Sequence, residues 1–279
     1  VWVEGMSGIK KFGESDLIGV LGSMGSNLKR KVSIYLIGGC AMTFMGAKLA
    51  TKDIDVVCTS TKDVKDLVEA MKNADFIRVD KLAKEYKTLG AWIVMERPDK
   101  MRFDVFDRQV CGKLEIDNNM QTRARFYRSF GNLDVYLMSG EDIFLFKGMT
   151  ERTDDLDDMR ILVERGIEWD DVKSECLSQK KSDEWAGALG SKLLDLQERF
   201  GIESPITKIM LDHTDMGLLE RTFRNIIGTN KMTFSDISKT VSKKYGYSDS
   251  WTRKQLRTLV GKKIVSRTRN GHGYIFSIK

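Results

Sequence analysis

The stretch from Tyr35 to Cys58, YLIGGCAMTFMGAKLATKDIDVVC, constrains the fold more than any other part of the chain. The apolar run 34–37 predicts a short buried strand. Gly38-Gly39 follows it directly, and glycine lets another group approach the backbone because it has no Cβ. Residues 40–50 are rich in Ala, Met, Leu and Phe at three- and four-residue spacing, which predicts a short packed helix after the glycines.

Two carboxylates follow this helix on a second predicted strand. Residues 53–58, DIDVVC, alternate so that Asp53 and Asp55 share one face. Neighbouring acids repel each other unless a cation or hydrogen-bond donors neutralise them. Divalent ions such as Mg²⁺ prefer oxygen ligands, so the pair indicates a divalent metal. The alternative interpretation is a turn followed by an exposed edge strand.

The glycine pair and the acid pair together resemble the nucleotidyltransferase fold of the DNA polymerase beta kind. Thirteen residues separate Gly39 from Asp53, at the long limit of that family's pattern. By this resemblance Gly38 and Gly39 face the triphosphate of a nucleoside triphosphate, and Asp53 and Asp55 hold Mg²⁺ or Mn²⁺. The implied fold class is α+β, a mixed sheet flanked by helices with carboxylates converging at one edge.

A third carboxylate of that pattern is expected on a later strand. Residues 101–107, MRFDVFD, follow a predicted turn at 98–100, and Phe103-Asp104-Val105 fits the apolar-acid-apolar form. The resemblance makes Asp104 a catalytic residue, either the general base or a ligand of the catalytic metal. Asp107 points to the opposite face of a regular strand and is interpreted as a polar residue at the strand end.

Lys147 is the next candidate. Ser139 and Asp142 resemble a capping box in front of a buried apolar helix. Lys147 lies on the buried side of that helix, where a lysine must either reach the surface or meet an anion. An acidic helix start follows at 152–162, RTDDLDDMRIL, which the helix dipole favours.

These two helices resemble one branch of the superfamily, the small nucleotidyltransferases related to toxin and antitoxin proteins that modify tRNA or a partner protein. Gly140 and Asp154 depart from that branch's usual S-P-E-D and R-x-K-D motifs. By this resemblance Lys147 contacts a phosphate, and Asp155 or Asp158 orients the phosphate or the substrate. For the two aspartates an exposed, capped helix is the alternative.

The remaining predicted elements of this region alternate helices with short strands. They are helices at 14–30, 61–72, 82–86 and from 117, and extended segments at 76–79, 91–95, 125–130 and 133–138. Residues 168–201 carry a helical core stripe, and Ser204-Pro205 breaks the chain. We therefore expect a nucleotidyltransferase domain at 1–165, a helical extension and linker at 166–213, and a further domain at 214–279.

The positive charge of the chain belongs to its last fifth. Residues 231–279 hold 12 Lys and Arg against 2 acids, whereas the other residues hold 34 against 38. Helices are predicted at 216–227, 235–245 and 251–261, with a hairpin formed by 264–267 and 274–278. This arrangement resembles a winged helix-turn-helix domain, which implies binding of DNA or tRNA, although many winged helices bind only protein. The candidate nucleic-acid-binding residues are Arg253, Lys254, Arg257, Arg267 and Arg269.

The composition favours some classes of protein over others. No apolar run approaches the roughly 20 residues of a membrane span, and the first residues lack the features of a signal peptide, so we expect a cytoplasmic protein without membrane contact. The four cysteines are scattered and only two histidines are present, which disfavours a zinc site. No Cys-His or Ser-His arrangement competes with metal-assisted transfer.

Two functions are consistent with these patterns. The first is a metal-dependent nucleotidyltransferase that moves a nucleoside monophosphate from a nucleoside triphosphate to an acceptor hydroxyl of tRNA, protein or a small molecule. The second is a DNA-binding transcriptional regulator whose nucleotidyltransferase-like domain is not catalytic. A third possibility combines them, an enzyme that holds a nucleic-acid substrate through its basic C-terminal domain.

Overall fold

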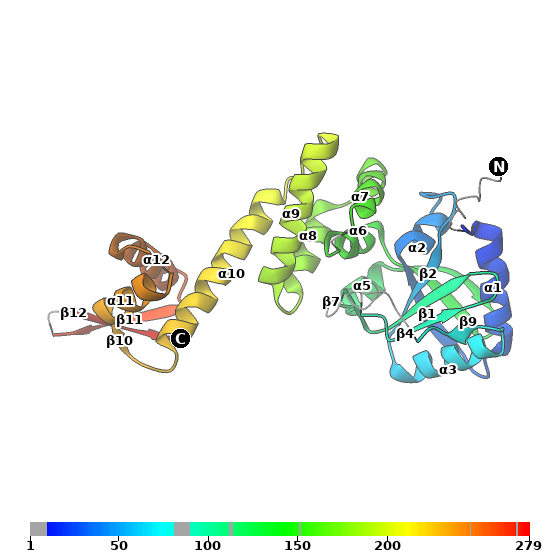
Figure 1. Cartoon of the computed structure of the whole chain (residues 1–279), viewed down its shortest axis with the longest axis horizontal. Coiled ribbons are helices and arrows are strands. Elements are labelled where there is room, and N and C mark those ends of the chain that lie inside the picture. Colours follow the sequence, from blue (N-terminus) through cyan, green and yellow to red (C-terminus); the bar gives the residue numbers. More distant parts are fainter. Residues whose placement is uncertain (1–9, 81–89, 112–113, 151, 246, 272) are drawn as a thin grey trace, which may run out of the picture. The chain divides into compact units, whose positions relative to one another are not determined.

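The computed structural model describes residues 10–80, 90–111, 114–150, 152–245, 247–271 and 273–279. The chain divides into two compact units, Val1–Thr207 and Lys208–Lys279. We call them the N-terminal and the C-terminal unit (Figure 1).

A mixed sheet forms the centre of the N-terminal unit, as the α+β fold class predicts. Its seven strands have the order β3-β4-β5-β2-β1-β9-β8. The β1–β9 and β2–β5 pairs are parallel and the other pairs are antiparallel. The strands are β1 Val32–Ile37, β2 Asp53–Cys58, β3 Ile77–Arg78, β4 Ile93–Glu96, β5 Arg102–Asp107, β8 Arg125–Phe130 and β9 Leu133–Leu137. A separate two-stranded sheet, β6 Gln109–Val110 and β7 Leu114–Glu115, was not expected from the sequence.

Two amphipathic helices, α1 Glu14–Asn27 and α3 Thr61–Lys72, pack against each other and against the sheet (Figure 1). Helix α3 begins where the Ser60 hydroxyl accepts a hydrogen bond from the Asp63 amide, as an N-cap residue does. Both helices bury their apolar residues, which supplies one side of the core.

The described part of the unit contains six further helices: α2 Gly38–Phe44, α5 Asn118–Arg123, α6 Gly140–Gly148, α7 Asp154–Glu164, α8 Trp169–Ser178 and α9 Ser182–Phe200. Arg123 of α5 ties three of them together. Its guanidinium lies 2.6 Å from a carboxylate oxygen of Asp142 on α6 and 2.6 Å from one of Glu175 on α8. Both carboxylates are almost fully buried, so the pairs hold the helices at fixed positions beside the sheet.

Two sequence predictions for the N-terminal unit need correction. The helix expected at 40–50 is α2 Gly38–Phe44, which ends early because Gly46 takes a left-handed φ of 69°. The stretch 168–201 is two helices, α8 and α9, separated around Lys181, which has a φ of 63°. The helix expected at 82–86 lies outside the described residues.

The C-terminal unit consists of helices and a three-stranded antiparallel sheet. Helix α10 Thr207–Ile227 starts well before the expected position 216. It is followed by β10 Met232–Thr233, α11 Phe234–Tyr245, α12 Asp249–Gly261, β11 Val265–Asn270 and β12 Gly273–Ile278, with sheet order β10-β12-β11. A compact apolar core of its own, which includes Phe223, Ile237, Leu256 and Phe276, joins these elements. In neither unit is any described helix long and apolar enough to cross a membrane.

Candidate active site

The three predicted carboxylates come together on the two central parallel strands. In the register of β2 and β5, Asp55 stands opposite Asp104, and Asp53 stands opposite Arg102. Residues directly opposite each other share a face of the sheet, and Asp53 shares the face of Asp55 because they are two residues apart. Asp53, Asp55, Arg102 and Asp104 therefore form one group on one face.

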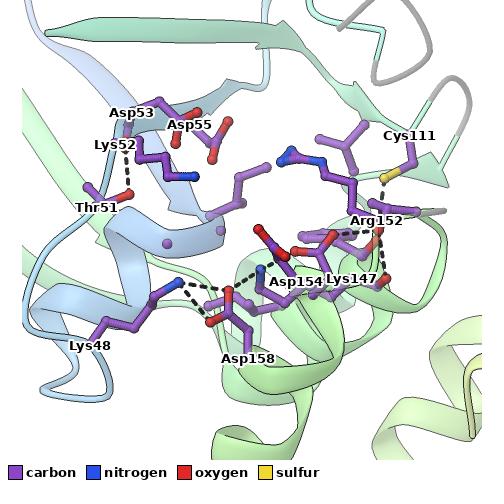
Figure 2. Close-up of a pocket in the computed structure, with 18 of the residues that line it drawn as sticks. Lys48, Thr51, Lys52, Asp53, Asp55, Cys111, Lys147, Arg152, Asp154 and Asp158 are labelled. Atoms are coloured by element: carbon purple, nitrogen blue, oxygen red, sulfur yellow. Dashed lines mark hydrogen bonds and ion pairs between the residues drawn. The ribbon is translucent and has the colours of Figure 1, made fainter. Parts of the chain in front are cut away.

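A cavity of about 430 Å³ opens beside this group (Figure 2). The described residues that line it include Asp53 and Asp55 but not Asp104, which is only 1% exposed. Its size lies within the range of small-molecule sites. Five basic side chains also line it: Lys11, Lys48, Lys52, Lys147 and Arg152.

The two glycines lie against polar side chains at the wall of this cavity. Gly38 has a φ of 59°, and a Cβ on it would lie 2.5 Å from a carboxylate oxygen of Asp55. A Cβ on Gly39 would lie 2.7 Å from the Thr51 hydroxyl. Any side chain at either position would therefore collide with its neighbour, and the absence of one lets the β1–α2 turn lie directly against Asp55.

Asp55 is strained electrostatically. Burial raises its pKa well above the ordinary value, and repulsion from Asp53 and Asp104 raises it further, while Arg152 and Lys147 oppose the rise. A carboxylate in this situation is stabilised as an anion by any additional cation. Asp53 and Asp55 together therefore favour a positively charged ligand in the cavity.

Asp104 has a different environment because Arg102 holds it. The guanidinium makes two hydrogen bonds to the carboxylate, Nε to Oδ1 at 2.7 Å and an Nη to Oδ2 at 2.5 Å. The same guanidinium lies 3.7 Å from an oxygen of Asp53. Burial still raises the pKa of Asp104, and Arg102 opposes that rise. The sequence analysis missed Arg102, although its position two residues before Asp104 on a strand is a readable signal.

Lys147 lies within a buried chain of charges. Its ammonium is 2.8 Å from Asp155 and 2.6 Å from Asp158, and Asp158 is also 2.7 Å from Lys48. Burial disfavours the charge of Lys147, but the two aspartates outweigh it and its pKa is raised. Both aspartates are buried, so an exposed helix face is the wrong interpretation for them. The anion that Lys147 meets in the structure is this pair of carboxylates.

Two basic side chains that the sequence analysis did not single out point into the cavity. Figure 2 shows Arg152 extending toward Asp53 and Asp55, and the Lys52 ammonium directed into the same space. Arg152 counteracts the raised pKa of Asp55, which agrees with this proximity. Asp107, in contrast, accepts a hydrogen bond from the Thr61 hydroxyl at 2.7 Å, as a polar residue at a strand end does.

We tested the carboxylate group for its fit to a metal ion. Within the described ranges, no three or more His, Cys, Asp or Glu side chains are arranged to hold one. Asp53 and Asp55 fit a hard divalent cation that completes its shell with oxygens of a ligand. Both oxygens of Asp104 accept hydrogen bonds from Arg102, and Asp104 does not line the cavity, so its role as a metal ligand or general base stays a prediction.

The basic residues predicted for the C-terminal unit are all exposed. Arg253, Lys254 and Arg257 lie on α12, and Arg267 and Arg269 lie on β11. Two of them cover aromatic rings: the guanidinium of Arg253 is 4.0 Å from the ring centre of Phe234, and that of Arg267 is 4.5 Å from the ring centre of Tyr274.

The comparisons with known proteins agree with the geometry of the N-terminal unit. A family model described as "Nucleotidyltransferase of unknown function (DUF6036)" matches residues 23–187, which is more than half of the chain. The match covers β1, the two glycines, all three carboxylates and the Lys147 network. A search of curated proteins found no match.

Proposed function

Because the chain belongs to the DUF6036 family of nucleotidyltransferases of unknown function, we propose that its N-terminal unit transfers a nucleoside monophosphate from a nucleoside triphosphate to an acceptor hydroxyl. In this reaction the acceptor oxygen forms a bond to the α-phosphorus, and the bond from that phosphorus to the bridging oxygen breaks. Pyrophosphate leaves, and the hydroxyl proton passes to a base or to solvent. The observation that carries the proposal is the Asp53–Asp55 pair, packed against Gly38 at the wall of a cavity lined by basic residues.

Asp53 and Asp55 are the residues that would hold Mg²⁺ or Mn²⁺. Such an ion, when bound, neutralises charge on the phosphates and on the leaving oxygen. The chain contributes the two carboxylates at fixed positions on a central strand, and the turn at Gly38-Gly39 leaves room beside them. A cation here also relieves the repulsion that raises the pKa of Asp55.

The triphosphate itself carries several negative charges, and Lys52 and Arg152, which point into the cavity, would offset them. Lys48 also lines the cavity, but its ammonium is paired with Asp158 at 2.7 Å. Lys147 lines the same cavity, so it contributes positive potential, but its ammonium is already paired with Asp155 and Asp158. We therefore assign Lys147 and the two aspartates mainly to holding α6 and α7 in place beside the nucleotide. Direct phosphate contact by Lys147 requires one of these ion pairs to lengthen.

The acceptor is not specified by these residues. The motifs S-x-E-D at Ser139 and R-x-x-D-x-x-D at Arg152 support membership of the toxin- and antitoxin-related branch, in which tRNA or a partner protein is modified. Both motifs lie in helices that border the cavity or hold its wall, α6 and α7. Under this proposal the acceptor hydroxyl approaches on the side of the cavity open to solvent.

A second proposal concerns the C-terminal unit, for which a nucleic acid is the expected ligand. Its helices and its three-stranded sheet have the order of elements of a winged helix-turn-helix domain, with α12 as the helix that would read a groove. The exposed arginines on α12 and β11 support contacts to phosphates. The regulator hypothesis assigns the whole function to this unit and none to Asp53 and Asp55.

Binding of nucleoside triphosphates tests the proposal for the N-terminal unit. Equilibrium binding of the four ribonucleoside triphosphates is measured with and without Mg²⁺ for the wild type and for the Asp53→Asn, Asp55→Asn double variant. We expect metal-dependent binding of at least one triphosphate by the wild type and its loss in the double variant. Equal binding by both proteins, or no binding by either, would contradict the proposed site.

A further inference from the structure

Asp104 is neutralised by a positive charge from the protein itself, the guanidinium of Arg102 on β5. Arg102 and Asp104 are two residues apart on β5, so their side chains lie on the same face and meet in a planar, two-point contact. Asp104 has 2% of its side chain exposed and Arg102 has 16%. A buried carboxylate that is paired in this way is already neutralised, and a second cation at its oxygens would be repelled by the positive charge of Arg102.

The position of Arg102 follows from strand register. Arg102 stands opposite Asp53 on the neighbouring strand. Its guanidinium lies 3.7 Å from a carboxylate oxygen of Asp53 and also contacts the carboxylate of Asp104. Arg102 thus lies between the first and the third aspartate, and it is not among the described residues that line the cavity. The cavity side of the group is left with Asp53 and Asp55.

We propose that Arg102 takes the place of a metal ion at Asp104, so that the site binds a divalent cation through Asp53 and Asp55 alone. Arg102 is then a positioning residue, which holds Asp104 out of metal coordination and offsets part of the charge of Asp53. This inference rests on the proposed function, because it concerns the metal site of the same reaction. It replaces the expectation that Asp104 is a metal ligand or the general base.

A charge-neutral double substitution tests this assignment. Removal of Asp104 alone would leave the positive charge of Arg102 beside Asp53 without the carboxylate that now neutralises it, and this charge would weaken metal binding by repulsion alone. The variant Arg102→Gln, Asp104→Asn removes the pair as a whole and keeps the net charge of the group. Binding of Mn²⁺ alone, followed by the electron paramagnetic resonance signal of the free ion, reports on the site without any need for turnover.

The expected results differ between variants. The double variant should bind Mn²⁺ within about threefold of the wild type, whereas Asp55→Asn should lose at least about tenfold, the equivalent of 1.4 kcal/mol. The single variant Arg102→Gln should bind Mn²⁺ more tightly than the wild type, because it returns an uncompensated carboxylate beside Asp55. Arg102→Lys, which keeps the charge, should restore wild-type affinity.

Arg97 supplies a matched control. Its guanidinium makes two hydrogen bonds, of 3.0 and 2.6 Å, to the carboxylate of Asp99, which is two residues further along the chain. Neither Arg97 nor Asp99 is among the described residues that line the cavity. Arg97→Gln should leave Mn²⁺ affinity unchanged, and thermal melts of all variants report whether each is folded. If the double variant loses as much affinity as Asp55→Asn, Asp104 is a ligand and the inference is wrong. If the wild type binds no Mn²⁺, the proposed metal site itself fails.

Discussion

Substitution of Gly38 by alanine is expected to damage the candidate active site more than the fold. Two effects act at this position: the left-handed φ of 59°, and a Cβ that would lie 2.5 Å from a carboxylate oxygen of Asp55. The backbone effect costs about 1–2 kcal/mol for a residue with a side chain. Displacement of the Asp55 side chain from its rotamer adds about 0.5–1.5 kcal/mol. We therefore expect a total destabilisation of about 1.5–3.5 kcal/mol.

Gly46 provides the control for the backbone effect. Its φ is 69°, but a Cβ there would meet nothing within 4 Å, so Gly46→Ala carries the strain without the collision. In a unit of this size 1 kcal/mol corresponds to about 2–4 °C in melting temperature. Gly46→Ala should lower the melting temperature by a few degrees and leave triphosphate binding intact. Gly38→Ala should lower it further and weaken metal-dependent triphosphate binding at least about tenfold. Unchanged binding in a folded Gly38→Ala protein would refute the role given to the contact with Asp55.

Three further predictions address charge. Asp55→Asn should stabilise the metal-free protein at neutral pH by more than about 1 kcal/mol, because burial and repulsion from Asp53 and Asp104 raise the pKa of folded Asp55, and each pKa unit is worth about 1.4 kcal/mol. This advantage should vanish below about pH 4, where the folded and unfolded states are both protonated, and should grow as the pH rises from there toward the folded-state pKa, which melting curves across pH would check. Lys147→Met should lower the free energy of unfolding by about 3–5 kcal/mol, because it leaves the buried carboxylates of Asp155 and Asp158 with less positive charge to neutralise them. Lys31→Met, which removes an exposed ion pair with Asp134, should lower it by less than about 1 kcal/mol. Equal denaturation midpoints for the two variants would contradict a stabilising role of the buried ion pairs. Arg257→Ala should weaken nucleic-acid binding and reduce the slope of log affinity against log salt by about 1, and an unchanged slope would exclude a phosphate contact at this position.

The sheet and its carboxylates could be predicted because they depend on local pattern. The alternation in 53–58 and in 101–107 defines two strands that carry Asp53, Asp55 and Asp104 on one face, and the structure pairs these strands with Asp55 opposite Asp104. The segments at 125–130 and 133–138 were also predicted, and they form β8 and β9. The period of two is strict where one face of a strand is buried, as in β9, in which Leu133, Val135 and Leu137 are buried and the residues between them are half-buried.

The features that could not be predicted depend on contacts between distant segments. Lys147 was expected to meet an anion, but only the packing of α6 on α7 determines that the anion is Asp155 with Asp158. Helix α2 was predicted too long, since the apolar pattern continues past the point where Gly46 turns the backbone. Arg102 and Asp104 are close in sequence, but their spacing predicts only a shared face of the strand; that the guanidinium lies near both Asp104 and Asp53 depends on the pairing of β2 with β5.

Transfer of label from a nucleoside triphosphate is the most direct test of the proposed activity. The wild type and the Asp53→Asn, Asp55→Asn variant are incubated with Mg²⁺ and either α- or γ-³²P-labelled triphosphate, in the presence of total RNA and cell extract. The account predicts that the α-label becomes attached to an RNA or protein acceptor, that the γ-label is released in pyrophosphate, and that the variant does neither. Attachment of the γ-label would indicate a kinase, and α-label transfer that persists in the variant would show that Asp53 and Asp55 do not carry the reaction.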